Sequence, residues 1–347
     1  MIRIGVLGAG RHSTRMHGPA LARCRDDRPD AVELRAVCDL DADRREDYAD
    51  EFGFAATYGS LDEMLVAESL DAVLAVTPPS ATRELAGDLL TRDVAVLVEK
   101  PPGTTPEAAR KLATIAERHD ADHAVSFNRR FNPAVRRARS WLAEHAAERP
   151  PTHAVSRLLR TDRFETEFLA YTGIHAADTV CSFLGRPRRV SARRWQSRPS
   201  AEGDGTPESG GECCAARATF GSDGSEGSDG SEGSEGSETA ATAQFALVPD
   251  AGCHAETLEL LGPGYDVRID LAAARLVVSA DGDEAVRWEV RDDAPVWERN
   301  GTLAETRAFL DAVDRGEGFA PSLSAGARSL ALATAMDAGD ERSFDGD

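Results

Sequence analysis

Short apolar segments alternate with helix-like segments along the first third of the chain. The apolar segments of strand length lie at residues 2–7, 32–38, 72–76, 94–98 and 123–127. Helix-start signals lie between them: Ser60 and Glu63 form a capping box, and Thr105 precedes a proline at the first helical position. This alternation predicts a parallel, doubly wound sheet with helices between its strands.

The pattern changes after about residue 128. Residues 133–151 predict a connecting helix, and helices are expected again near residues 303–315 and 324–336. Alternating apolar and polar positions predict antiparallel strands at residues 152–160, 213–220, 241–248, 257–261, 265–271, 275–280 and 285–290. We therefore expect two domains, at residues 1–125 and 126–347.

Residues 221–238 interrupt the second domain with six consecutive Gly-Ser-acid triplets. The segment has no side chain to bury and carries six like charges, so it cannot offset the entropy lost on ordering. We expect a disordered insert that joins two strands of a hairpin. A cation-binding or partner-binding role is the alternative.

Composition restricts the partners of the chain. Its net charge is −20, with 60 acidic and 40 basic residues, and Lys100 and Lys111 are the only lysines. Such a surface repels nucleic acid and anionic membranes, and it resembles the acidic surfaces of proteins adapted to high salt. The absence of a long apolar run and of a leader predicts a cytoplasmic protein. None of the six cysteines lies in a C-x-x-C pair, and no Cys/His spacing suits zinc, so no metal site is expected.

Gly8-Ala9-Gly10 follows the first predicted strand and precedes a helix, as in a dinucleotide-binding fingerprint. Glycine there permits a tight turn and lets backbone N–H groups, with Arg11 beside them, approach a pyrophosphate. Ser13 stands at the third glycine position. The alternative is a simple strand-to-helix turn.

Asp39 ends the second predicted strand, where a carboxylate can accept hydrogen bonds from both adenosine ribose hydroxyls. It lies 29 residues after Gly10, so the intervening helix or loop is longer than usual. A 2′-phosphate would be repelled by Asp39, which favours NAD. The nearby Arg44 and Arg45 leave NADP possible.

Two further strand ends carry candidate residues. Thr77-Pro78 follows the fourth strand, and Glu99-Lys100 follows the fifth. Ligands of open α/β sheets bind at the carboxyl ends of the strands, so we expect all four residues to face the cofactor. A partly desolvated Lys100 could act as an acid or base, and a surface ion pair is the alternative.

Several motifs together resemble the Gfo/Idh/MocA oxidoreductase family, the group of glucose–fructose oxidoreductase and inositol dehydrogenase. Besides the strand ends, they are residues 127–133 (FNRRFNP), 173–178 (GIHAAD), 309–313 (FLDAV) and 321–323 (PSL). The resemblance covers nearly the whole chain outside the insert. It implies a Rossmann domain followed by an α/β domain built on an open, mainly antiparallel sheet. It also implies NAD(P)-linked oxidation or reduction of a sugar, polyol or related compound.

In the family pattern the lysine works with an Asp-x-x-x-His pair. Lys100 and His175 match two of these places, whereas Tyr171 stands where the family has aspartate. The resemblance therefore implies that His175 takes the substrate proton, with Tyr171 as an uncharged neighbour. His17 also matches a common family position, where we expect a structural role. A buried structural histidine is the alternative for His175.

Substrate contacts are the least determined part of this interpretation. Asn128, Arg129 and Arg157 are candidates, and the arginines could equally be surface residues. We expect a sugar-like substrate and a homo-oligomer, either a dimer or a tetramer. An NAD-dependent glycosidase and a non-catalytic sugar or nucleotide sensor of the same fold remain alternatives.

Overall fold

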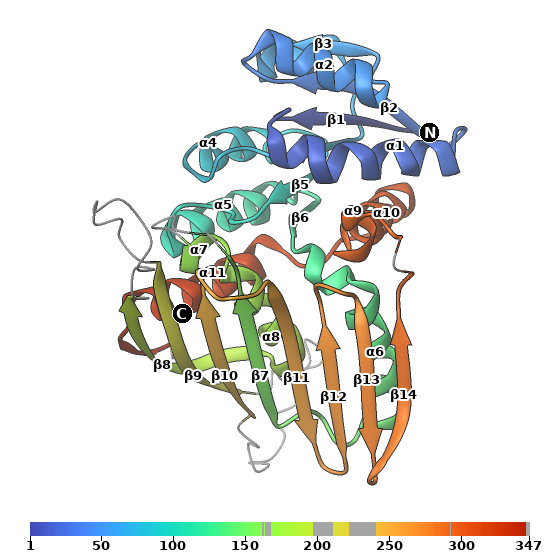
Figure 1. The fold of residues 1–347 in the computed structure, drawn as a ribbon. Helices are drawn as coiled ribbons and strands as arrows, with labels where there is room; N and C mark the ends of the chain where they lie inside the picture. Colours follow the sequence, from blue (N-terminus) through green and yellow to red (C-terminus); the bar gives the residue numbers. More distant parts are fainter. Residues whose placement is uncertain (162, 164–167, 197–210, 222–240, 292, 345–347) are drawn as a thin grey trace, which may run out of the picture. The chain divides into compact units, whose positions relative to one another are not determined.

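A computed structural model describes residues 1–161, 163, 168–196, 211–221, 241–291 and 293–344 (Figure 1). Contacts divide the chain into two compact units. The Rossmann unit comprises residues 1–133 and 291–327, and the sheet unit comprises residues 134–290 and 328–347. The described part of the chain lacks a helix with the length and apolar character needed to cross a membrane.

The Rossmann unit is built on a parallel six-stranded sheet in the order β3-β2-β1-β4-β5-β6. This is the strand order of dinucleotide-binding folds, which reverses direction between β1 and β4. The strands are β1 (Ile2–Leu7), β2 (Val32–Cys38), β3 (Ala56–Tyr58), β4 (Ala72–Ala75), β5 (Ala95–Glu99) and β6 (His123–Ser126). The predicted doubly wound sheet is confirmed, with β3 as a short additional edge strand.

Helices cover this sheet on both faces, and their starts follow the predicted caps. Ser60 accepts a hydrogen bond from the N–H of Glu63, and Thr105 accepts one from Ala108. The helical segments are η1 (Ser13–His17), α1 (Gly18–Asp27), α2 (Ala42–Phe52), α3 (Leu61–Ala67), α4 (Pro79–Leu89), α5 (Pro106–His119), η2 (Asn128–Phe131), α9 (Val296–Arg299) and α10 (Thr302–Arg315). The segment η1 is a π-helical turn and η2 is a 3₁₀ turn.

Helix α10 belongs to the Rossmann unit although it lies far along the chain. Its Leu303, Phe309 and Leu310 are buried in the same core cluster as residues of β1, α1 and α2. Glu305 is fully buried and accepts a hydrogen bond from the Ser126 hydroxyl at 2.7 Å. The expected domains at residues 1–125 and 126–347 therefore differ from the compact units, because residues 291–327 return to the first unit.

The sheet unit carries a nine-stranded sheet in the order β14-β13-β12-β11-β7-β10-β9-β8-β15. All pairings are antiparallel except that of β10 with β7. The strands are β7 (His153–Leu159), β8 (Arg186–Gln196), β9 (Glu212–Gly221), β10 (Ala241–Val248), β11 (Ala255–Gly262), β12 (Tyr265–Asp270), β13 (Arg275–Ala280), β14 (Asp283–Glu289) and β15 (Glu341–Ser343). The expected open, mainly antiparallel sheet is confirmed.

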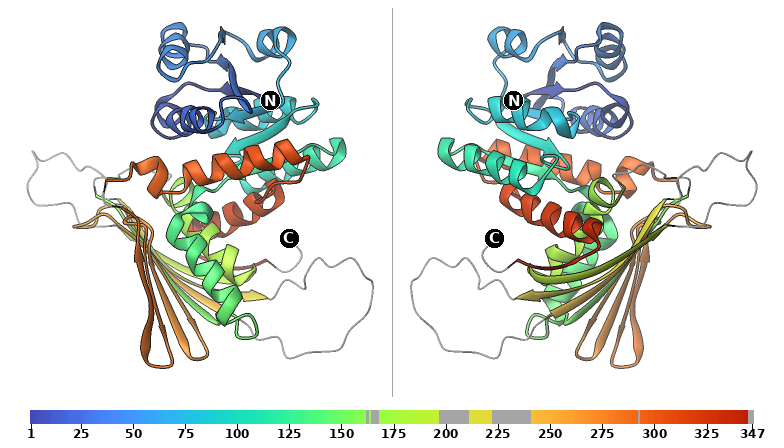
Figure 2. Two further views of the ribbon diagram at one scale, coloured as in Figure 1. Left: turned by 90° about the vertical axis from the view of Figure 1, so that its right-hand side faces the viewer. Right: turned by 90° about the vertical axis from the view of Figure 1, so that its left-hand side faces the viewer.

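Helices lie against one face of the nine-stranded sheet, as Figure 2 shows for α6 and α8. The helices of this part of the chain are α6 (Pro133–His145), α7 (Phe168–Tyr171), α8 (Ile174–Leu184) and α11 (Leu323–Ala338). Helix α8 contacts β7 and β10. From α6, Arg137 stacks over the ring of Trp288 on β14.

The pairing of β9 with β10 bears on the insert. The two strands are antiparallel, with Phe220 opposite Ala241, so the Gly-Ser-acid segment does connect neighbouring strands. Residues 222–238 of that segment lie outside the described residues. The expectation that the segment itself is disordered stays a prediction.

Candidate active site

The predicted cofactor residues lie at the carboxyl ends of four neighbouring strands. Gly8 follows β1, Asp39 follows β2, Thr77 comes shortly after β4, and Lys100 follows β5. The order β2-β1-β4-β5 makes these four strand ends contiguous along one edge of the parallel sheet. This edge includes the point between β1 and β4 where the strand order reverses, which is where open α/β sheets bind ligands.

The two fingerprint glycines have different structural roles. Gly8 has φ +104°, and a Cβ atom there would overlap the carbonyl oxygen of Val76. A Cβ atom on Gly10 would have nothing within 4 Å. Gly8 is therefore required by the turn itself. Gly10 leaves its backbone open to close approach by a ligand, which fits the pyrophosphate of a dinucleotide.

Ser13 explains the missing third glycine. Its side chain is fully buried, and its hydroxyl donates a hydrogen bond to the Tyr48 hydroxyl of α2 at 3.0 Å. The position accepts a small polar side chain because α2 provides a partner for it. Arg11, two residues earlier, is exposed at the helix start.

Asp39 is held by three donors of the protein. One carboxylate oxygen accepts the N–H of Ala9 at 2.9 Å, and the other accepts the N–H of Asp41 and the Arg44 guanidinium, each at 2.9 Å. Partial burial would raise the pKa of Asp39, but these hydrogen bonds and the charge of Arg44 hold it below its usual value. Asp39 thus stays ionised at neutral pH and directly contacts the glycine turn.

Thr77 and Pro78 directly precede α4, with Pro78 as its N-cap residue. The hydroxyls of Thr77 and Thr82 lie 2.9 Å apart, and that of Thr82 also donates to the carbonyl of Pro78 at 3.1 Å. Lys100 is half-buried. Both strand ends therefore lie at the predicted sheet edge.

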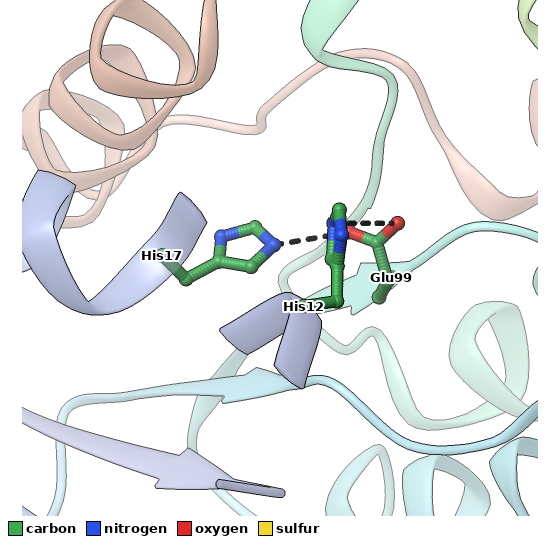
Figure 3. A group of neighbouring side chains, drawn as sticks. All are labelled: His12, His17 and Glu99. Carbon is green, nitrogen blue, oxygen red and sulfur yellow. Dashed lines mark hydrogen bonds and ion pairs between the residues drawn. The ribbon is translucent and has the colours of Figure 1, made fainter. Parts of the chain in front are cut away.

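Glu99 has partners that the spacing of the sequence did not reveal. Its carboxylate is 10% exposed, and its two oxygens lie 3.5 Å from Nε2 of His12 and 3.0 Å from Nε2 of His17 (Figure 3). Burial would raise the pKa of Glu99, but the charges and hydrogen bonds of the two histidines outweigh burial and hold it well below its usual value. Glu99, predicted to contact the cofactor, is thus engaged by the protein itself.

The predicted catalytic residues of the sheet unit lie at a junction between two helices. Tyr171 ends α7, and His175 is the second residue of α8 and is 5% exposed. Gly173 lies between the two helices. A Cβ atom there would overlap the carbonyl of Leu169, so the position requires glycine. On the same helix as His175, Asp178 is fully buried and accepts a hydrogen bond from Ser329 at 2.9 Å.

The three substrate candidates have different environments. Asn128 is buried and donates a hydrogen bond to Thr302 at 3.2 Å, while Arg129 donates to the amide oxygen of Asn128 at 2.9 Å. This pair connects η2 to α10 within the Rossmann unit. Arg157 is exposed and lines a hollow of about 250 Å³ over β7, β11, β12 and β13.

The side of the sheet on which Arg157 lies also bears on its role. Its neighbours Ser156 and Leu158 on β7 are buried, and side chains alternate between the two faces of a strand. Helix α8 packs on the buried face of the sheet. Arg157 therefore lies on the opposite face, away from α8. The sheet unit does not bring Arg157 together with His175.

Comparison with known proteins agrees with this geometry. Residues 2–127 match the Gfo/Idh/MocA family model, described as an oxidoreductase family with an NAD-binding Rossmann fold. The match identifies residues 2–127 as a Rossmann domain of the Gfo/Idh/MocA type. The resemblance predicted from the sequence motifs is confirmed.

Named relatives are similar to the chain over part of their length. The chain is 34% identical over 137 residues to the rhizopine catabolism protein MocA of Rhizobium meliloti, covering 40% of this chain and 41% of that protein. It is 27% identical over 146 residues to the NADP⁺-dependent D-xylose 1-dehydrogenase of Haloarcula marismortui, covering 41% of this chain and 39% of that protein. These matches span about two fifths of each relative.

Solved structures share the fold over nearly the entire chain. A levoglucosan dehydrogenase in complex with NADH has a TM-score of 0.79 at 17% identity, with 99% of this chain and 98% of that chain covered. The UDP-N-acetylglucosamine 3-dehydrogenase of Acidithiobacillus ferrooxidans has a TM-score of 0.76 at 21% identity, with 98% and 97% covered. At these identities the likeness establishes the two-unit fold.

Proposed function

We propose that this protein is an NAD(P)-dependent dehydrogenase or reductase acting on the hydroxyl or carbonyl group of a sugar, polyol or related compound. The observation that carries the proposal is the sheet edge formed by β2, β1, β4 and β5. The open backbone of Gly10, the ionised Asp39 and Lys100 lie at the ends of these strands, which supports a dinucleotide-binding role for this edge. The match to an oxidoreductase family over residues 2–127 supports the reaction class.

NAD is the proposed cofactor, with NADP as a weaker ligand. Asp39 carries a negative charge where the adenosine ribose of a Rossmann ligand lies, and this charge repels a 2′-phosphate. Its partner Arg44 is half-exposed and could pair with such a phosphate instead. Both cofactors occur among similar proteins: one relative is an NADP⁺-dependent xylose dehydrogenase, and one similar structure is a levoglucosan dehydrogenase in complex with NADH.

We assign the proton chemistry to Lys100, His175 and Tyr171. A bound nicotinamide would exchange a hydride with the substrate carbon. His175 takes the proton of the substrate hydroxyl, and Lys100 carries the positive charge that favours its loss. Tyr171 replaces the family carboxylate with a neutral hydroxyl. It can hydrogen-bond but cannot raise the basicity of an imidazole as a carboxylate does.

The replacement of the carboxylate by Tyr171 specifically favours a second candidate function. A protein of this fold that binds nucleotide or sugar without turnover would act as a sensor, and a lost catalytic carboxylate is what such a protein would show. We place this second because Lys100 and His175 are both retained.

Absorbance of the reduced nicotinamide tests the proposal. The purified protein is incubated with NAD⁺ or NADP⁺ and a panel of aldoses, inositols, sugar acids and glycosides. Lys100→Ala serves as the matched inactive control. Turnover on a member of the panel that is lost in the control is expected. Ligand-induced stabilisation without any absorbance change would instead favour the sensor. Cleavage of a glycoside without net change in NADH would favour an NAD-dependent glycosidase.

We also propose a cytoplasmic location and a homo-oligomeric state. Cys24, Cys38, Cys214 and Cys253 carry thiols, not disulfides, which suits a reducing compartment. Burial raises the pKa of Cys24 to about 11 and that of Cys214 to about 12, so these two thiols are inert structural groups. Light scattering behind a sizing column distinguishes a dimer or tetramer from a monomer.

A further inference from the structure

We propose that His12, His17 and Glu99 form a binding site for one divalent transition-metal ion of the zinc type. The spacing of cysteines and histidines predicted no metal site, because Glu99 lies 82 residues from His17 in the chain. Folding brings the end of β5 against η1, and the three side chains point toward one another (Figure 3). Metal binding at these three residues can be measured without cofactor or substrate, so the outcome of its test is distinguishable from that of the dehydrogenase proposal.

The distances between the three side chains suit shared coordination. One ligand atom from each residue lies within 4.8 Å of the others. Nε2 of His17 is 3.0 Å from one Glu99 oxygen, and Nε2 of His12 is 3.5 Å from the other. Ligands bound to Zn²⁺ at about 2.0–2.2 Å are separated by roughly 3.0–3.5 Å in tetrahedral or octahedral geometry. The two His–Glu separations fall within this range, and since all three ligand atoms lie within 4.8 Å of one another, side-chain shifts can bring them around one ion.

The π-helical turn explains why the two histidines converge. In an α-helix, residues five apart project about 140° away from each other, since each residue turns the helix by about 100°. Here the N–H of Gly18 bonds to the carbonyl of Ser13, the i to i+5 pattern of a π-turn. This wider turn brings His12 and His17 toward one side, with ring centroids 5.5 Å apart and ring planes at 72°. Single π-turns are rare and occur often at functional sites.

The ligand types select the metal. Two imidazole nitrogens and one carboxylate oxygen suit Zn²⁺, Co²⁺ or Ni²⁺, whereas Ca²⁺ and Mg²⁺ prefer oxygen ligands. The carboxylate supplies one negative charge beside two imidazoles that bind metal in their neutral form.

The three side chains differ in their exposure to solvent. The side chains of His17 and Glu99 are 3% and 10% exposed, whereas that of His12 is 51% exposed. The ion would thus be bound by the buried side chains of His17 and Glu99 on its protein side and by His12 on its solvent side. Three protein ligands with an accessible fourth position are typical of zinc sites that also bind water or a small molecule.

Titration of the full-length protein with Co²⁺ and Zn²⁺ tests the site directly. After treatment with a chelator and its removal, Co²⁺ is added and its visible d–d absorption is recorded, and Zn²⁺ binding is followed by calorimetry. We expect one equivalent per chain, and we expect Zn²⁺ to displace Co²⁺. His12→Ala, at an exposed position that does not endanger folding, should weaken binding at least about 10-fold, the loss that even outer partners of a metal cause.

His119→Ala is the matched control, because His119 is an exposed histidine at the end of α5 and lies outside the cluster. This variant should bind Co²⁺ as the wild-type protein does. Glu99→Gln, which keeps the shape but removes the charge, should lose binding as well. The proposal is overturned if the wild-type protein takes up no stoichiometric Co²⁺, or if His12→Ala binds it with unchanged affinity.

Discussion

The two fingerprint glycines allow folding and cofactor binding to be separated by a pair of equivalent substitutions. Gly8→Ala places a methyl group on a residue with φ +104° and against the carbonyl of Val76. The conformational strain costs ~1–3 kcal/mol, and the overlap with backbone adds ~1–3 kcal/mol. Gly10→Ala places the same methyl group in open space, so its free energy of unfolding should change by less than ~0.5 kcal/mol.

Thermal unfolding followed by circular dichroism measures the first effect. At roughly 2–4 °C per kcal/mol for a domain of this size, Gly8→Ala should lower Tm by about 5–20 °C, whereas Gly10→Ala should melt with the wild type. Calorimetry with NAD measures the second effect. Blocking hydrogen bonds from the backbone to a charged phosphate costs about 1.5–3 kcal/mol, so Gly10→Ala should weaken NAD binding about 10- to 100-fold.

Each half of this experiment has an outcome that refutes the reasoning. A Gly8→Ala variant that melts within 2 °C of the wild type, on the order of 1 kcal/mol or less, would show that the turn does not have the described geometry. A Gly10→Ala variant with wild-type NAD affinity would show that the cofactor does not approach the backbone at this residue. The first failure concerns the fold, and the second concerns the cofactor site.

Four further predictions follow from residues described above. In calorimetry, Asp39→Ala should weaken NAD binding and reduce the ratio of NAD affinity to NADP affinity. If the wild-type protein binds NADP more tightly than NAD, the role of Asp39 is contradicted. Lys100→Ala and His175→Ala should each lower kcat about 10²–10⁴-fold with NAD affinity within a few fold, and Tyr171→Phe should cost as much only if the hydroxyl replaces the family carboxylate. Because the pKa of Glu99 lies below its ordinary value of 4.5, its ionised form stabilises the protein above that pH, and this stabilisation is lost as the pH falls through the lowered pKa. In a plot of Tm against pH, Glu99→Gln should therefore lose less Tm than the wild type as the pH falls into the acidic range. Parallel curves for the two proteins would contradict the stabilising role of ionised Glu99. With a net charge of −20, Tm should rise when KCl is raised to molar levels, and an unchanged Tm would count against a salt-adapted surface.

Local signals in the sequence predicted the Rossmann sheet and the strand ends that form its candidate cofactor edge. The caps at Ser60 and Thr105 act within one helical turn, and the residues at the strand ends are fixed by the strands that precede them. Such features depend on neighbours in the chain, so a single sequence reveals them. The same holds for Gly8, whose positive φ belongs to the turn after β1.

Strand β8 shows where this reasoning failed. Five of its 11 residues are arginines, and only Pro187 and Val190 are buried, so the apolar alternation that marks a strand is missing. Its position comes from backbone pairing with β9 on one side and β15 on the other. Pairing of this kind is a property of two segments and cannot be read from either one alone.

The partnership of His12 with His17 escaped prediction for a related reason. Read as an α-helix, residues five apart point in different directions, and the sequence of η1 carries no recognised signal for a π-turn. The contact of both with Glu99 depends on β5, far along the chain. The packing of α10 against the Rossmann unit also depends on distant residues, because the bond between Ser126 and Glu305 spans 179 residues.

The return of residues 291–327 to the Rossmann unit has a consequence for the nascent chain. A ribosome completes all six strands of the parallel sheet long before it makes α10, whose Phe309 and Leu310 complete the core. Until then the apolar surfaces of α1 and β1 that α10 covers stay exposed, while the whole sheet unit is synthesised. The N-terminal part therefore cannot reach its final stability during translation, and it is the part of the chain for which a chaperone would have the longest opportunity to bind.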